Sequence, residues 1–161
     1  HQQKIEERIT KSLKRPQAVT TIKTTTQPRR FLFNPSFVVP NDLKDHQGKV
    51  FQKAGTLINP LHDYSLRRPL LLIDGDDRRQ VTWAFKQHED RQQAKEFVPK
   101  IILVKGSPFE LMEQFNTPVY FDQGGVLVKK LGIEQVPARV SQYGDRLLIE
   151  EVKLKEDQVD D

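Results

Sequence analysis

The chain has 161 residues, enough for one domain whose hydrophobic core needs no disulfide support. It contains no cysteine, which excludes disulfides, thiol catalysis, iron–sulfur clusters and cysteine-ligated zinc. Its mean hydropathy is −0.64, and no aliphatic run is longer than that at residues 70–73, which is far shorter than the roughly 20 apolar residues of a membrane-spanning helix.

The formal net charge of +4 is unevenly distributed along the chain. Residues 1–33 carry eight basic and two acidic side chains, whereas residues 34–161 carry 18 basic and 20 acidic ones. This basic arm indicates either a solvated tether or a segment that binds nucleic acid or anionic lipid. The tether is favoured, because residues 1–30 contain no Phe, Tyr or Trp for base stacking.

Residues 1–30 predict a short helix followed by a linker. Ile5, Ile9 and Leu13 recur at helical spacing, so we expect an amphipathic helix over residues 5–14 that needs a partner surface. Pro16 ends this pattern and a threonine-rich stretch follows, which predicts an extended linker to residue 30. The chain begins without Met or a signal peptide, so we expect a mature or truncated form.

Short β-prone runs alternate with proline and glycine turns between residues 31 and 60. This pattern predicts two or three short strands. We therefore expect four parts: a basic helical and linker arm at 1–30, a short β-rich segment at 31–65, a folded domain at 66–155 and an acidic tail at 156–161.

The folded domain has the pattern of an α/β protein. Residues 70–73 and 101–104 are apolar on both faces, as central buried strands are. Asp76 or Asp77 is placed to cap a helix extending as far as Phe97, and Ser107 opens a capping-box pattern for the next helix.

The later elements follow from the same kind of pattern. Residues 119–122 predict a short strand or an extended connection, and residues 126–131 a short helix that Gly132 ends. Residues 138–142 and 146–152 predict a hairpin that turns at 143–145. The element order predicts a parallel pair, an antiparallel pair and a mixed sheet with helices on its faces.

Three acidic residues, Asp74, Asp76 and Asp77, follow the first buried strand, where ligands bind in open α/β sheets. Their spacing resembles that of haloacid dehalogenase phosphatases, which implies Asp74 and Asp76 as nucleophile and acid/base. Ser107 and either Lys129 or Lys130 would then stand at the later sequence motifs of that family. The acidic pair that this family needs after a late strand is missing. Helix capping is therefore favoured, with a Mg²⁺ or Ca²⁺ site as the alternative.

The remaining candidate groups give weaker signals. The four histidines share no metal-ligand spacing, so we expect no zinc site. No serine lies in a nucleophile elbow, and the glycine pair at 124–125 lacks the surroundings of a phosphate-binding loop. The histidines are His1, His46, His62 and His88.

Residues 131–140 carry the most specific local motif: Gly132-Ile133 ends a helix, and Val136-Pro137 opens an apolar strand three residues later. This motif resembles the thioredoxin-fold signature, and the resemblance extends over residues 66–152. It implies a cis Pro137 that faces the helix start at 76–79; the alternative is a trans proline that opens an edge strand.

The thioredoxin family has two cysteines at that helix start, whereas this chain has two aspartates and two arginines, so the resemblance predicts no disulfide exchange. Exposed backbone groups beside a cis proline can pair with an extended peptide. We therefore expect a partner-binding cradle formed by Asp76, Asp77, Arg78, Arg79, Val136 and Pro137.

Longer strings, at residues 59–61, 68–77, 102–108, 119–125 and 136–142, carry a closer resemblance. They resemble the TraW family of periplasmic pilus-assembly proteins of F-type conjugative type IV secretion systems. The resemblance implies export to the periplasm, no catalysis, no cofactor, and TrbC-like and TraU-like partner proteins.

This family resemblance assigns no binding residues. Besides the cradle, the β-rich segment 31–60 could dock a partner strand, and the helix expected at 5–14 could join a partner's bundle. The rival function is a metal-dependent phosphatase-like enzyme that uses Asp74 and Asp76.

Overall fold

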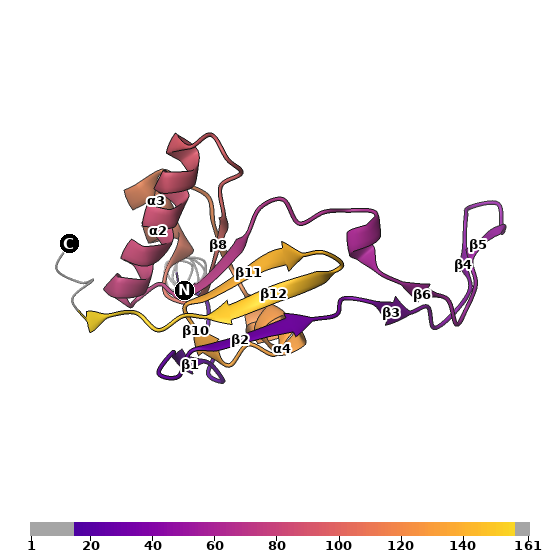
Figure 1. Ribbon diagram of the computed structural model, residues 1–161, viewed down its shortest axis with the longest axis horizontal. Helices are drawn as coiled ribbons and strands as arrows, with labels where there is room; N and C mark the ends of the chain where they lie inside the picture. Colours follow the sequence, from indigo (N-terminus) through magenta and orange to yellow (C-terminus); the bar gives the residue numbers. More distant parts are fainter. Residues whose placement is uncertain (1–14, 157–161) are drawn as a thin grey trace, which may run out of the picture.

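The computed structural model describes residues 15–156. Its main element is a six-stranded mixed sheet with the strand order β2-β12-β11-β7-β8-β9 (Figure 1). β7, β8 and β9 are parallel, whereas β11, β12 and β2 pair antiparallel with their neighbours. The predicted mixed α/β architecture is confirmed. The strands are β2 (Arg29–Phe33), β7 (Leu70–Asp74), β8 (Lys100–Lys105), β9 (Val119–Phe121), β11 (Ala138–Tyr143) and β12 (Arg146–Glu151).

The core has two layers because successive strand residues point to opposite faces of the sheet. Leu71 and Ile73 of β7 belong to a cluster with Phe85 of α2 (Arg78–Gln93) and with residues of α3 (Pro108–Phe115). Leu72 lies in the opposite layer, with Val128 and other residues of α4 (Val126–Leu131). β7 thus has both faces covered, as the sequence predicts for a central strand.

Helix boundaries follow local chemistry. Ser107 caps α3 by accepting a hydrogen bond from the backbone N–H of Glu110 at 3.1 Å, as the capping-box pattern predicts. α2 ends at Gln93, earlier than the expected Phe97. The reason is Lys95, whose φ of 59° lies in the left-handed region and closes the helix, leaving the Phe97 side chain exposed.

The segment expected to be a solvated linker is extended but packs against the body. We name residues 15–28 the strap. It contains β1 (Lys23–Thr24), which pairs parallel with β10 (Gln135–Val136), and Val19 and Ile22 pack against the core. The chain then enters the main sheet as β2, so residues 31–33 are not part of a separate β-rich segment. The helix expected at 5–14 lies outside the described residues.

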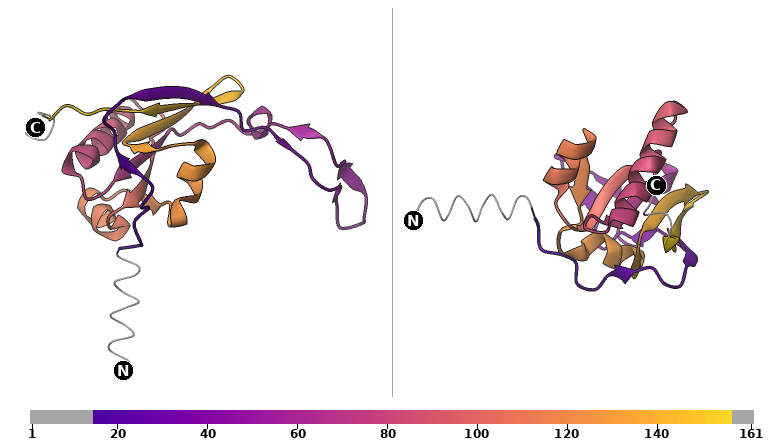
Figure 2. Two further views of the ribbon diagram at one scale, coloured as in Figure 1. Left: turned by 90° about the horizontal axis from the view of Figure 1, so that it is seen from below. Right: turned by 90° about the vertical axis from the view of Figure 1, so that its left-hand side faces the viewer.

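Residues 34–59 project from the body as a narrow β-ribbon, which we name the finger (Figures 1 and 2). β3 (Phe37–Val38) pairs with β6 (Leu57–Ile58), and β4 (Leu43–Lys44) pairs with β5 (Val50–Gln52), so residues 29–58 contain five strands instead of two or three.

The base of the finger is fixed to the body at the turn of the β11–β12 hairpin. The side-chain amide of Asn59, just before η1 (Pro60–His62), donates to the carbonyl of Asp145 at 2.9 Å. The backbone N–H of Leu66 donates to the Gln142 side chain at 2.7 Å. Within residues 15–156, no helix is long and apolar enough to cross a membrane.

Candidate functional site

The start of α2 is organised by the three aspartates. Asp77 is the N-cap: its side chain accepts a hydrogen bond from the backbone N–H of Arg79 at 3.0 Å. Asp74 accepts one from the backbone N–H of Asp76 at 2.8 Å, and the buried Gln80 side chain bonds to both Asp74 N–H and Asp77. These contacts are helix capping and turn stabilisation, the role that the sequence analysis favours.

The phosphatase-like arrangement finds no support at this edge of the sheet. Burial raises the pKa of Asp74, and the hydrogen bond from Asp76 N–H and the charge of Lys105 only partly oppose it. Ser107, which that resemblance places at a later motif of the phosphatase family, uses its hydroxyl oxygen to cap α3. Among residues 15–156, no group of three His, Asp or Glu side chains is placed to hold a metal ion.

The Val136–Pro137 peptide bond is cis, as the thioredoxin-like motif predicts. Pro137 lies beside the start of α2 and shares with it a pocket of about 260 Å³. The resemblance therefore predicts this juxtaposition correctly. The pocket is lined by Thr24–Thr26 of the strap, Asp77, Arg79 and Gln80 of the helix start, Pro137, and Lys153, Leu154 and Glu156 of the C-terminal segment.

The strap occupies the backbone edge of this cradle. The N–H of Lys23 donates to the carbonyl of Glu134 at 3.3 Å, and the N–H of Thr25 donates to the carbonyl of Val136 at 2.8 Å. Val136 and Pro137 are consequently buried, so the backbone groups expected to be exposed there are already paired within the chain. The reason lies in pairing across more than 100 residues, which no local pattern encodes.

The four helix-start residues form the rim of the cradle and keep some exposure. Asp76 pairs with Arg15 at the beginning of the strap at 2.7 Å, with side chains 34% and 47% exposed. Arg79 lies 3.6 Å from Asp77, and Arg78 is exposed. The structure thus places Asp77, Arg79 and Pro137 around one pocket, and it leaves the rim, and not Val136 or Pro137, accessible to another molecule.

A buried carboxylate holds the strap and β2 in place, and the sequence analysis missed it. The side chain of Glu151 is fully buried and pairs with both Nε (2.6 Å) and Nη2 (2.8 Å) of Arg29. It also accepts hydrogen bonds from the backbone N–H groups of Glu134 and Gln135 and from the Gln135 side chain. We name Arg29, Gln135 and Glu151 the clamp.

The contacts of the clamp favour the ionised form of the Glu151 carboxylate, as its lowered pKa shows. Burial by itself raises the pKa of Glu151, but the hydrogen bonds from Arg29, from two backbone N–H groups and from Gln135 outweigh it, and the pKa falls to about 2. Gln135 in turn accepts from the N–H groups of Thr26 and Gln27 and donates to the carbonyl of Gln27. The alternation of side chains along a strand could have revealed this carboxylate: Glu151 lies two residues after Ile149 and so on the same inward face of β12.

The finger is a second candidate surface because it exposes apolar side chains that a two-stranded ribbon cannot bury. Val38 and Leu57 lie opposite each other on β3 and β6 and are 59% and 68% exposed. Phe51 on β5 is 62% exposed. The ribbon strands also have unpaired outer edges, to which another strand can add.

One curated protein is similar to this chain over most of its length. The chain is 43% identical over 143 residues to Protein TraW of Escherichia coli (strain K12), and the match covers 88% of this chain and 66% of that protein. No family model matches the chain, and no solved structure matches it significantly.

The fold and site therefore define a cysteine-free mixed α/β protein whose cis-proline cradle has its backbone edge paired with the strap of the same chain. The chain belongs to the TraW family. It spans about two thirds of the length of the TraW protein that it matches.

Proposed function

We propose that the protein is a non-catalytic component of a conjugative apparatus, acting in the periplasm in assembly of the pilus of an F-type type IV secretion system. The observation that carries this proposal is the 43% identity to TraW over 88% of the chain. The proposal includes TrbC-like and TraU-like assembly proteins as partners, as the family resemblance implies.

The test is complementation of a donor strain that lacks its own traW gene. The chain is expressed with an export signal, and plasmid transfer frequency is measured by mating. We expect transfer to rise well above that of the deletion strain. Transfer at the deletion level, with the protein present in the periplasmic fraction, would contradict the proposal.

We propose further that residues 66–152 form a thioredoxin-like domain that works as a scaffold. The support is the strand order β8-β7-β11-β12, with a helix between the parallel β7 and β8, and the cis proline before β11 opposite the start of α2. Because Asp76, Asp77, Arg78 and Arg79 stand at that helix start, the scaffold binds without thiol chemistry.

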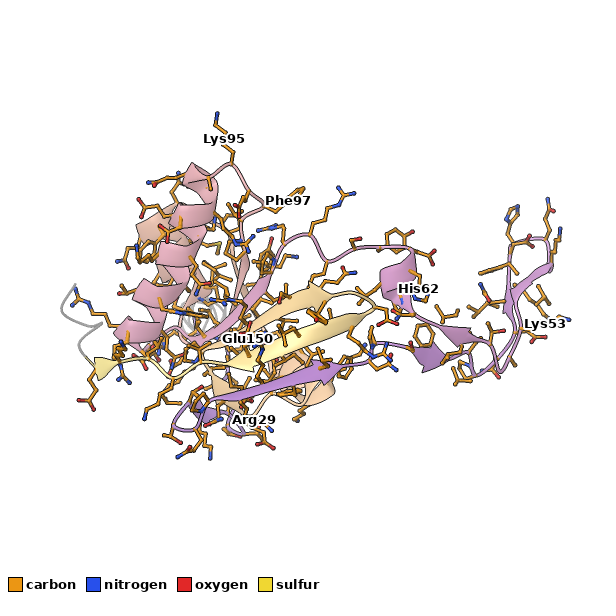
Figure 3. All side chains as sticks on the ribbon, viewed as in Figure 1. Arg29, Lys53, His62, Lys95, Phe97 and Glu150 are labelled. Carbon is orange, nitrogen blue, oxygen red and sulfur yellow. The ribbon has the colours of Figure 1, made fainter. Side chains whose placement is uncertain are left out.

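The first partner surface that we propose is the rim of the cradle. Reversing the charges of Arg78 and Arg79 to Glu should weaken capture of a TrbC-like partner in a pull-down, because both residues stand in the first turn of α2 and neither is fully buried. Lys95→Glu is the matched control: it also reverses an exposed positive charge, just beyond the other end of α2 (Figure 3). Equal capture by wild type, the Arg78/Arg79 variant and Lys95→Glu would exclude the rim as the partner surface.

The second surface is the finger, where a partner strand adds to the ribbon. Replacing Phe51 and Leu57 by Ser removes exposed apolar surface, so we expect unchanged thermal unfolding but reduced transfer. Lys53→Ser, also exposed and between them on the finger, is the control and should keep wild-type transfer (Figure 3). Wild-type plasmid transfer by the Phe51/Leu57 variant would show that the finger is not a partner surface.

The phosphatase alternative is tested with a generic phosphate ester and Mg²⁺, comparing wild type with Asp74→Asn. We expect no hydrolysis above background in either protein, because Asp74 is committed to the turn before α2. Hydrolysis that depends on Asp74 would replace the scaffold proposal.

A further inference from the structure

The strap is held mainly by hydrogen bonds and buries little of its own surface. Arg15 pairs with the partly exposed Asp76, the N–H of Val19 donates to the carbonyl of Val104 at 2.8 Å, and β1 contributes a ladder of two residue pairs. Most strap residues are exposed; among them only Thr25 is fully buried, at 5% exposure. A segment with little buried apolar surface and short ladders opens at low free-energy cost compared with the core.

The cradle beneath the strap recognises extended backbone more than particular side chains. The carbonyls of Glu134 and Val136 each accept one strap N–H. The Gln135 side chain accepts from the N–H groups of Thr26 and Gln27 and donates to the carbonyl of Gln27. Nε2 of Gln135 also donates to the buried carboxylate of Glu151, so the body holds this amide from the side opposite the strap contacts with Thr26 and Gln27.

Three features of the strap specify which extended segment fits. Arg15 meets the carboxylate of Asp76, so a basic residue is favoured at the N-terminal end. Val19 and Ile22 contact the core and Val19 lies against Gly125, where a Cβ would come within 2.7 Å of its side chain. Thr25 is buried beside Pro137, which limits that position to a small side chain.

From these contacts we infer that the cis-proline cradle is a binding site for an extended peptide, and that residues 15–28 are its ligand within the chain. A partner segment with a basic residue, two apolar residues and a small residue at matching spacing would bind by replacing the strap. The inference rests on the proposed scaffold function, to which it adds the class of ligand and the intramolecular competition that regulates access.

The experiment uses the full chain and a labelled synthetic peptide of residues 15–28. Thr25→Pro in the protein removes the N–H that donates to Val136 and should release the strap without touching the body. Thr21→Pro is the matched control, since Thr21 is exposed and lies in a turn. By fluorescence anisotropy, we expect the Thr25→Pro protein to bind the peptide at least about tenfold more tightly than wild type or Thr21→Pro.

Hydrogen exchange and a variant peptide test whether the strap is released and whether the peptide binds as the strap does. Hydrogen exchange at Val19 and Lys23 must accelerate in Thr25→Pro, and a peptide that itself carries Thr25→Pro must not bind. Unchanged exchange, or loss of the near-ultraviolet signal of Trp83, would show that the strap is an inseparable part of the fold. No gain in peptide binding would show that the uncovered cradle does not bind an extended peptide. Each of these results would overturn the inference. None of these results bears on complementation of plasmid transfer, which tests the proposed function separately.

Discussion

The clamp predicts a specific pH-dependent loss of stability for Glu151→Gln. The carboxylate accepts hydrogen bonds from two nitrogens of Arg29, one side-chain nitrogen and two backbone N–H groups. An amide keeps only one acceptor oxygen and turns an NH₂ group toward these donors. Several charge-assisted bonds are therefore lost together.

The pKa of Glu151 gives the magnitude. It falls from the ordinary value of 4.5 to about 2, and each unit corresponds to roughly 1.4 kcal/mol, so ionised Glu151 contributes roughly 3 kcal/mol at neutral pH. Because the folded-state pKa is depressed, this contribution is complete above about pH 4.5 and is lost as the pH falls toward 2. In a chain of this size, the corresponding decrease in Tm is roughly 6–12 °C.

The assay is urea or thermal unfolding of wild type, Glu151→Gln and Glu150→Gln between pH 7 and pH 2. Glu150 is the matched control (Figure 3): its contacts with Arg30 and Arg139 are long, at 3.9 and 3.8 Å, and its side chain is 28% exposed. Its loss should cost less than about 1 kcal/mol. Similar losses for the two variants at pH 7, or a Glu151→Gln deficit that persists at pH 2, would refute the reasoning.

Other substitutions test the local arguments. Asp77→Ala removes the cap of α2 and should cost about 1–2 kcal/mol in denaturant unfolding, against less than about 0.5 kcal/mol for Asp76→Ala, which breaks only an exposed ion pair; equal losses would contradict the capping role. Gly75→Ala places a Cβ 2.8 Å from a backbone oxygen of β8 and should cost roughly 1–3 kcal/mol, so an unchanged urea midpoint would be inconsistent with this close approach. Leu72→Ala opens a cavity in the core and should cost roughly 2–5 kcal/mol, whereas Leu57→Ala on the finger should change stability by less than about 0.5 kcal/mol; the reverse order would exclude the described packing.

The elements that the sequence predicted are those that local chemistry determines. Residues 70–73 are apolar at every position, which only a strand covered on both faces requires, and Ser107 and Asp77 are caps because their side chains reach backbone N–H groups two or three residues away. The cis proline was predicted from the resemblance of residues 131–140 to the thioredoxin-fold signature.

What sequence reasoning missed depends on contacts between distant parts of the chain. The strap pairs with β10 through β1, and β2 pairs with β12; both partners lie more than 100 residues away in the sequence. The residue pattern of neither segment indicates which strand it pairs with. The site prediction was incomplete for the same reason: it named residues at the helix start and the cis proline, but not the strap that pairs with Val136. A charged Glu151 at an inward position of β12 was the available clue, because a buried carboxylate requires a partner such as Arg29.

The way in which the finger is rooted has a mechanical consequence. The chain leaves the sheet from the end of β2 and returns to it at the start of β7, and both points lie at the same end of the sheet as the β11–β12 turn that Asn59 contacts. A pull on the finger tip is therefore directed along the strands and shared between an edge strand and a central one. The hydrogen bonds of both ladders are loaded in shear, all at once instead of one after another, so tension applied at the finger is carried by the sheet as a whole.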